Sequence, residues 1–136
     1  MTGLAVAASW LWLGMVLAIS FLEAPLKFRA PGLDLRTGLA IGRIVFRALN
    51  RFEMVLAVVL VVGLASGDPG RVAAVAGTVA VVALALQLGV VRPALGRRSR
   101  AVLAGASGRR SNIHRWYVAL EFAKVAALAV AGIALV

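Results

Sequence analysis

The chain has 136 residues, of which 62% are hydrophobic and 15% are charged, and it carries a formal net charge of +10. The hydrophobic share exceeds the roughly 45–50% of ordinary soluble domains, which excludes a soluble globular fold. The absence of cysteine excludes disulfides, thiolate metal ligands and thiol redox chemistry.

The first apolar segment, about residues 3–26, predicts a membrane-spanning helix. An uncharged run of about 20 residues crosses roughly 30 Å of hydrocarbon at 1.5 Å per residue. The segment has no basic residues before it and no small-residue cleavage site after it, so we expect a mature helix and not a secretory signal. A turn is expected next, because Pro31 disfavours a helical conformation at Ala30.

The second segment joins an amphipathic half to an apolar half. Asp34 is expected to cap its helix. Polar side chains then recur at helical spacing and predict a stretch along the membrane surface: Arg36, Arg43, Arg47 and Asn50. Span two is predicted over about residues 49–66, either separate from this stretch or continuous with it. The turn residues 66–70 should end it.

Two further spans are predicted over about residues 71–91 and 113–136. The third is rich in alanine and valine, with small residues at the spacing that lets helices approach closely. A basic loop over residues 92–112 connects it to the fourth. The sequence therefore predicts an all-α membrane protein of one domain, residues 1–136. Its fold is a four-transmembrane-helix bundle with an amphipathic interfacial extension before span two.

Positive charge is concentrated in the predicted loops 27–48 and 92–112, whereas the connection between spans two and three carries only Arg71. Cytoplasmic loops carry the excess of lysine and arginine. We therefore expect a multi-pass protein of the cell inner (cytoplasmic) membrane with both basic loops cytoplasmic and both termini extracytoplasmic. The basic surface should contact anionic lipid headgroups and not nucleic acid.

Polar and ionisable side chains within the spans form the candidate site. Such groups are costly in hydrocarbon and usually face the interior of a bundle. On span four they share one helix face, and their depths place all of them in the cytoplasmic half of the bundle. The predicted substrate- or ion-binding residues are Glu23, Glu53, Glu121, Lys124, His114 and Gln87.

Two interpretations of this layer remain open. In the structural one, Glu121 only neutralises Lys124, so that Glu121→Gln would leave the lysine stranded in the bundle, and the other two carboxylates pair with basic residues at the interface, namely Lys27, Arg47 or Arg51. In the functional one, the cluster exchanges a proton or binds a cation.

Cofactors are not expected from the sequence. Three carboxylates and one imidazole would suit a transition metal, yet no Glu-x-x-His pair occurs, so the metal assignment stays unknown. His114 is the only histidine, which excludes bis-His haem ligation within one chain. No P-loop, dinucleotide-binding or hydrolase motif is present, so an enzyme is less expected than a non-enzyme.

Arg43 and Arg47 lie one helical turn apart, beside Gly38 and Gly42. We expect the two arginines to bind the headgroup of an anionic lipid. The glycines form a G-x-x-x-G pattern, which is more typical of a close helix contact than of a phosphate-binding loop.

The runs Trp10–Gly14 and Phe21–Phe28, with a last span that opens at His114, resemble a loose group of small four-span bacterial membrane proteins of unknown function. The pattern is similar to the transmembrane-protein family associated with cisplatin resistance. The resemblance implies a topology more than an activity, and the matching positions are Gly14, Pro25, Phe28 and His114. The charged residues that depart from the pattern are Glu23, Glu121 and Lys124.

Together these features predict a small integral membrane transporter or permease subunit with a proton- or cation-linked polar site in the cytoplasmic half of the bundle. One alternative is a non-catalytic interaction or assembly subunit of a larger membrane complex, and another is a membrane-embedded enzyme acting on a lipid. The expected partners are anionic membrane lipids and either a second copy of the chain or another membrane protein.

Overall fold

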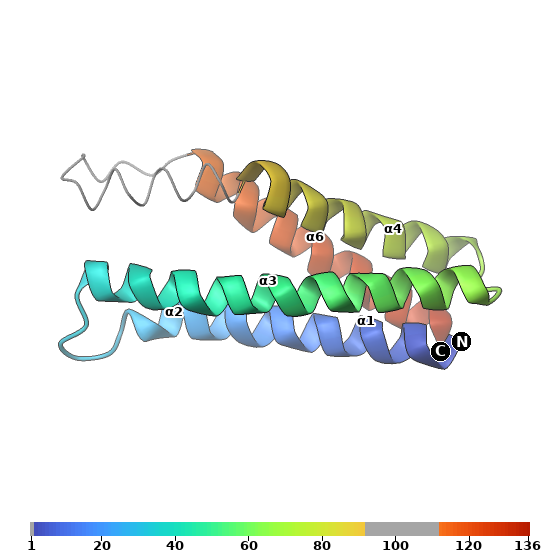
Figure 1. Ribbon diagram of the computed structural model, residues 1–136, viewed down its shortest axis with the longest axis horizontal. Coiled ribbons are helices and arrows are strands. Elements are labelled where there is room, and N and C mark those ends of the chain that lie inside the picture. Colours follow the sequence, from blue (N-terminus) through green and yellow to red (C-terminus); the bar gives the residue numbers. More distant parts are fainter. Residues whose placement is uncertain (1, 92–111) are drawn as a thin grey trace.

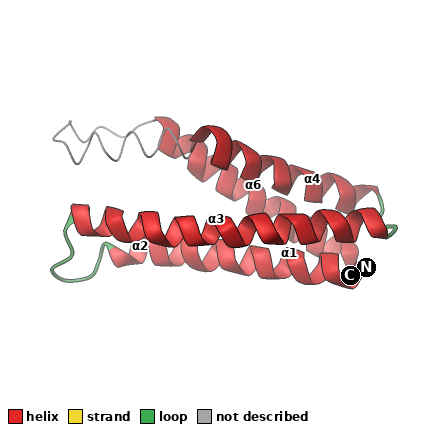
Figure 2. Cartoon of the chain, viewed as in Figure 1, coloured by secondary structure: helices red, strands yellow, loops and turns green. Residues whose placement is uncertain are grey.

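A computed structural model describes residues 2–91 and 112–136, and this part of the chain is entirely helical or loop (Figures 1 and 2). Of the two predicted basic loops, the one over residues 92–112 lies outside the described residues except for its last residue. The elements are α1 (Thr2–Val16), the π-helical η1 (Leu17–Glu23), α2 (Ala24–Lys27), α3 (Leu35–Ser66), α4 (Arg71–Leu86), the π-helical η2 (Gln87–Val91) and α6 (Asn112–Leu135).

Within the described residues, four helical stretches are long and apolar enough to cross a membrane, which confirms the predicted all-α membrane fold. They comprise Gly3–Lys27, Leu35–Ser66, Arg71–Gly89 and Arg115–Leu135.

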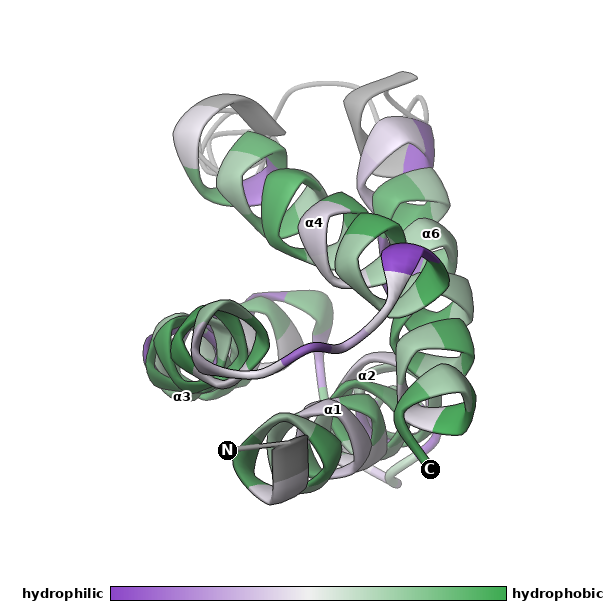
Figure 3. Cartoon of the chain, turned by 90° about the vertical axis from the view of Figure 1, so that its right-hand side faces the viewer, coloured by the Kyte–Doolittle hydropathy of each residue, from purple (hydrophilic) through white to green (hydrophobic). Residues whose placement is uncertain are grey.

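The helices pack as two antiparallel pairs that share a core. α1 lies beside α3, and α4 lies beside α6, with the start of α1 and the end of α6 at the same end of the bundle (Figure 1). Seen from that end, α1 lies between α3 and α6, and hydrophobic residues cover most of each helix (Figure 3). The core centres on Trp12, Leu60 and Leu128, which are fully buried.

α3 is one continuous helix of 32 residues, so the predicted surface stretch and span two are the same element. The sequence between Asp34 and Ser66 contains no proline that would break it. At 1.5 Å per residue it is about 48 Å long, which exceeds a hydrocarbon layer of roughly 30 Å. The predicted loop over residues 27–48 is therefore mostly helix, and its non-helical part is residues 28–34.

The two ends of α3 follow the predicted signals. Asp34 caps the helix, because its Oδ1 accepts a hydrogen bond of 2.7 Å from the backbone N–H of Thr37. Hydrogen bonding by Thr37, from its side chain and its backbone, lowers the pKa of Asp34. This cap therefore contributes stability above about pH 4 and loses it as the pH falls through the lowered pKa. At the other end, the turn over residues 67–70 closes at Gly70 with φ +81°.

The π-helical turns of η1 end at Glu23, two residues before Pro25. A proline inside a helix lacks the N–H donor, and its ring clashes with the carbonyl four residues earlier, here that of Phe21. Widening the preceding turns relieves that clash. The second π-helical segment, η2, begins at Gln87, whose backbone N–H is shared between the carbonyls of Ala83 and Leu84.

α1 and α3 lie in close contact at Gly63, where a Cβ would lie 2.9 Å from the backbone nitrogen of Ala5. We expect Gly63→Ala to lower the free energy of unfolding by about 1–3 kcal/mol, because backbone atoms cannot rotate away as a side chain can. Thermal unfolding of the purified protein in detergent measures the effect. Gly14→Ala is the matched control, since its methyl group meets no atom within 4 Å. Equal losses in both variants would show that this contact does not hold the pair.

Candidate functional site

A network of polar side chains lies inside the bundle. Lys124 of α6 places its Nζ 2.5 Å from Oε2 of Glu53 on α3 and 2.5 Å from Oε1 of Glu121, one turn earlier on its own helix. All three side chains are at most 3% exposed. We call Glu53, Lys124 and Glu121 the buried triad. Gln87 extends it, because its Nε2 donates a hydrogen bond of 2.7 Å to Oε1 of Glu121.

Trp12 completes the network from α1. Its indole Nε1 donates a hydrogen bond of 2.7 Å to Oε2 of Glu53, so this one oxygen accepts from both Trp12 and Lys124. Trp12 is fully buried, as is Ser9 one turn before it. Trp12 was not among the predicted site residues. One sequence signal could have indicated it. Trp12 lies three residues after Ser9 and four before Val16, which places it on the same helix face as Ser9 and Ser20.

The triad contains more negative than positive charge. Two ionised carboxylates against one ammonium leave a formal charge of −1 in a part of the bundle that is shielded from solvent. Glu53 Oε1 and Glu121 Oε2 are also buried and accept no hydrogen bond from any described residue. Because uncompensated buried charge is costly, such an arrangement favours the uptake of one proton or one monovalent cation.

The other predicted carboxylate, Glu23, lies at the end of η1 and takes no part in the triad. It is half-buried, and its Oε2 accepts no hydrogen bond within the described part of the chain. Glu53 pairs with Lys124, whereas the structural interpretation paired the two carboxylates Glu23 and Glu53 with Lys27, Arg47 or Arg51. In the described part, no three His, Cys, Asp or Glu residues lie close enough together to hold a metal ion, and the side chain of His114 lies outside that part.

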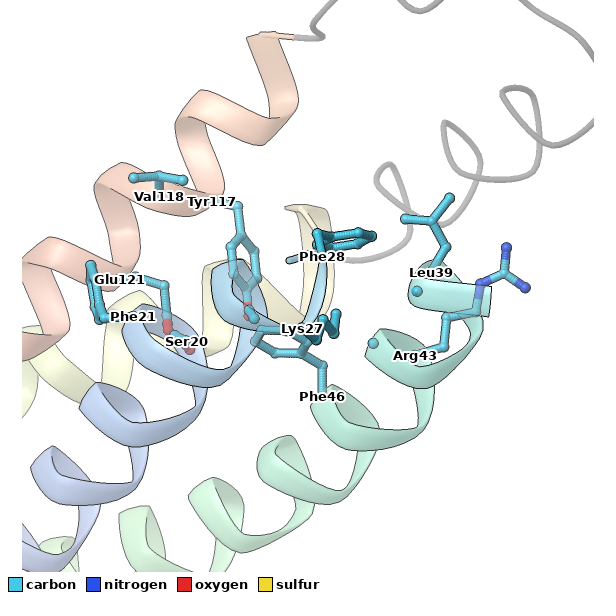
Figure 4. A pocket seen from close by; sticks show the side chains of 13 residues that line it. Ser20, Phe21, Lys27, Phe28, Leu39, Arg43, Phe46, Tyr117, Val118 and Glu121 are labelled. Atoms are coloured by element: carbon cyan, nitrogen blue, oxygen red, sulfur yellow. The ribbon is translucent and has the colours of Figure 1, made fainter. Parts of the chain in front are cut away.

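A cavity of about 280 Å³ borders the triad (Figure 4). It lies between η1 and α2 on one side, the first half of α3 on another, and α6, and we call it the interfacial cavity. Phe21, Phe28 and Phe46 form apolar walls, and Phe21 is fixed against Phe122 of α6 with ring centroids 5.0 Å apart. The polar residues that line it are Ser20, Lys27, Arg43, Tyr117 and Glu121.

The polar groups of the cavity are distributed along its length. Glu121 and Ser20 lie near each other at one end, and Arg43 lies at the other with its guanidinium turned outward (Figure 4). Glu121 therefore belongs both to the triad and to the cavity wall. Of the two predicted headgroup-binding arginines, both exposed on α3, Arg43 lines this cavity and Arg47 does not.

Lys27 is held among aromatic rings inside the interfacial cavity. Its Nζ lies 5.4 Å from the ring centroid of Phe28 and 5.9 Å from that of Phe46. Gly42 makes room for it, because a Cβ there would lie 2.9 Å from the ammonium, and Gly38 lies against the ring of Phe28. The G-x-x-x-G pattern thus marks a close contact. No described carboxylate forms an ion pair with Lys27.

No protein-family model matches the chain, and no curated protein or solved structure matches it. Its function is therefore inferred from the geometry of the buried triad and the interfacial cavity.

Proposed function

We propose that the chain is a small subunit of a membrane transporter, in which the buried triad takes up and releases a proton or a monovalent cation. The observation that carries this proposal is the sharing of one ammonium by two buried carboxylates, each at 2.5 Å. A purely structural ion pair needs one carboxylate for each ammonium. An additional carboxylate in the membrane interior is costly, and such groups commonly belong to ion or proton pathways.

The double position of Glu121 supports transport further. Its Oε1 binds Lys124 and Gln87, and its side chain also lines the interfacial cavity. A change of charge in the triad therefore acts directly on whatever occupies the cavity. This gives one physical route by which a proton or cation gradient drives the movement of a second solute.

Proton uptake by the triad is testable without knowing the substrate. Infrared difference spectra of the purified protein between neutral and acidic pH should contain the carbonyl band of a buried carboxylic acid. The band should disappear in the variant that combines Glu53→Gln with Glu121→Gln, because no triad carboxylate remains. Asp34→Asn is the control, since this exposed cap lies away from the triad. A band that persists in the double variant would assign the proton to another group.

Transport itself is measured in proteoliposomes with an imposed proton, sodium or potassium gradient. We expect wild-type protein to carry a flux that Glu121→Gln abolishes, because a triad of one carboxylate and one ammonium is already neutral. Asp34→Asn should retain the flux. Unchanged flux in a correctly folded Glu121→Gln protein would remove Glu121 from the mechanism.

We further propose the inner membrane as the location, with both termini extracytoplasmic, on the basis of charge distribution. The chain contains no cysteine, so a thiol reagent labels only a cysteine that is introduced by mutation. Asp68→Cys should react with a membrane-impermeant maleimide on intact cells, whereas Ala30→Cys should react only after permeabilisation. The opposite pattern would invert the topology.

The alternative of an assembly subunit is favoured by a separate feature, an apolar groove of about 520 Å³ between α4 and α6. Valine and alanine side chains line most of it, including Val75, Val79 and Ala126. Small residues allow close helix packing in membranes. If the Glu121→Gln variant keeps all measured activities while Ala126→Leu dissociates the protein from a membrane partner, the assembly role replaces transport.

A further inference from the structure

We infer that the interfacial cavity binds an organic anion with an apolar body, and that the anion enters together with a proton on the buried triad. The inference rests on the proposed function, since it names the second solute that the triad would drive. Its starting point is Lys27, a half-buried ammonium that contacts two aromatic rings and pairs with no described carboxylate.

The cavity selects for negative charge. Lys27 and Arg43 both line it, while the one carboxylate in its wall, Glu121, already binds Lys124 and Gln87 through Oε1. A cationic solute would meet the ammonium of Lys27, which no described carboxylate neutralises. An anion instead gains a charge-assisted contact with this ammonium.

The cavity also selects for an apolar body of limited size. Its volume of about 280 Å³ is near the lower end of small-molecule pockets, which span roughly 300–1,000 Å³. Phe21, Phe28 and Phe46 provide the apolar walls. The occupant is therefore a small amphiphilic anion, or the headgroup of an anionic lipid whose chains remain in the bilayer.

The link to the proton follows from Glu121, which faces the same cavity as the bound anion. The charged or titratable groups around it are Glu53 from α3, Lys124 and Tyr117 from its own helix, and Lys27 and Arg43 across the cavity. The triad has a formal charge of −1 when ionised, and a proton removes it. A cavity of this volume is about 8 Å across, so at an effective dielectric constant of about 20 the repulsion weakens anion binding about 30-fold.

The test uses benzenesulfonate, whose charge stays constant over the working pH range, and isothermal titration calorimetry of the purified protein in neutral detergent. Wild-type protein should bind it up to about 30-fold more tightly at acidic pH than at alkaline pH. Glu121→Gln should bind with an affinity that does not depend on pH, because its triad is neutral throughout. Benzylamine, which has the same ring and a positive charge, should not bind.

Two further variants assign the groups. Lys27→Met should weaken benzenesulfonate binding at least tenfold at every pH, whereas Arg51→Gln, which removes an exposed arginine of α3 outside the cavity, should not. Histidine is the side chain that ordinarily changes charge near neutral pH, so His114→Asn is measured in parallel and should keep the pH dependence. Loss of the dependence in His114→Asn, or its persistence in Glu121→Gln, would overturn the link to the triad.

Nanodiscs distinguish the two sources of the anion. If phosphatidylglycerol suppresses benzenesulfonate binding relative to phosphatidylcholine, the occupant is a lipid headgroup, and if it does not, the occupant is a soluble anion. Absence of benzenesulfonate binding at any pH overturns the inference. A triad that takes up no proton in the infrared experiment, in a protein that also carries no flux under a proton, sodium or potassium gradient, contradicts the proposed function. If the triad does take up a proton but benzenesulfonate binds equally at all pH values, only the present inference is contradicted.

Discussion

Lys124→Met is expected to lower the free energy of unfolding by about 3–5 kcal/mol, which is the usual loss when one partner of a buried ion pair is removed. The reason is specific to the triad. In the wild-type protein, the Lys124 ammonium lies 2.5 Å from one oxygen of Glu53 and 2.5 Å from one oxygen of Glu121. Without the ammonium, these two carboxylates remain on either side of its former position. Two like charges then face each other away from solvent. The measurement is thermal or chemical unfolding in a fixed detergent.

Neutralising the whole triad provides the control. A variant that adds Glu53→Gln and Glu121→Gln to Lys124→Met should regain most of the loss, because no ionised group stays unpaired. Glu121→Gln alone should cost little, since Lys124 keeps Glu53 as its partner. This differs from the structural interpretation of the sequence, in which Glu121→Gln strands the lysine. If the neutral variant is no more stable than Lys124→Met, charge imbalance is not the cause.

Trp12→Ala is expected to cost about 3 kcal/mol, because it leaves a large void at a fully buried position. In a membrane the loss comes mainly from packing contacts, since lipid solvates apolar surface as well as a protein core does. Trp12→Phe should show an intermediate loss of about 1–3 kcal/mol, because Glu53 then lacks the indole donor at 2.7 Å.

Trp116→Ala is the matched control for Trp12. This residue is on α6 and 66% exposed, so its removal should change the unfolding free energy by no more than about 0.5 kcal/mol. Similar losses at both positions would mean that tryptophan content, and not the contact with Glu53, determines stability. A loss in Trp12→Phe that vanishes in a Glu53→Met background, which has no side-chain oxygen to accept from the indole, would assign the loss to the hydrogen bond.

The parts of the fold that depend on local sequence were predictable. Asp34 caps α3, and Gly70 closes the turn before α4, because capping and turn chemistry act within a few residues. The four spans follow from length and hydrophobicity. For α3, the sequence predicted a surface helix and a span but left open whether the two are continuous. Charge at helical spacing does not reveal whether they share one axis.

The composition of the site was less predictable. Counting residues along a helix gives the depth of a side chain but not the rotation of one helix against another. The predicted membrane depth of Glu23 is similar to that of Glu53 and Glu121, yet Glu23 takes no part in the triad. Trp12 was missed because an aromatic residue in a span is usually assigned to packing or to the lipid interface. Its partner Glu53 lies 41 residues further along the chain.

The separation between Glu53 and Lys124 bears on how the protein is made. They are 71 residues apart, so the carboxylate leaves the ribosome well before its counter-ion exists. At translation rates of about 5–20 residues per second, the delay is roughly 4–14 s. During this interval α3 carries an unpaired acidic group, whose insertion into the bilayer is unfavourable until α6 arrives. A nascent chain that stops before Lys124 therefore presents a poorly inserting helix to the machinery that degrades incomplete membrane proteins.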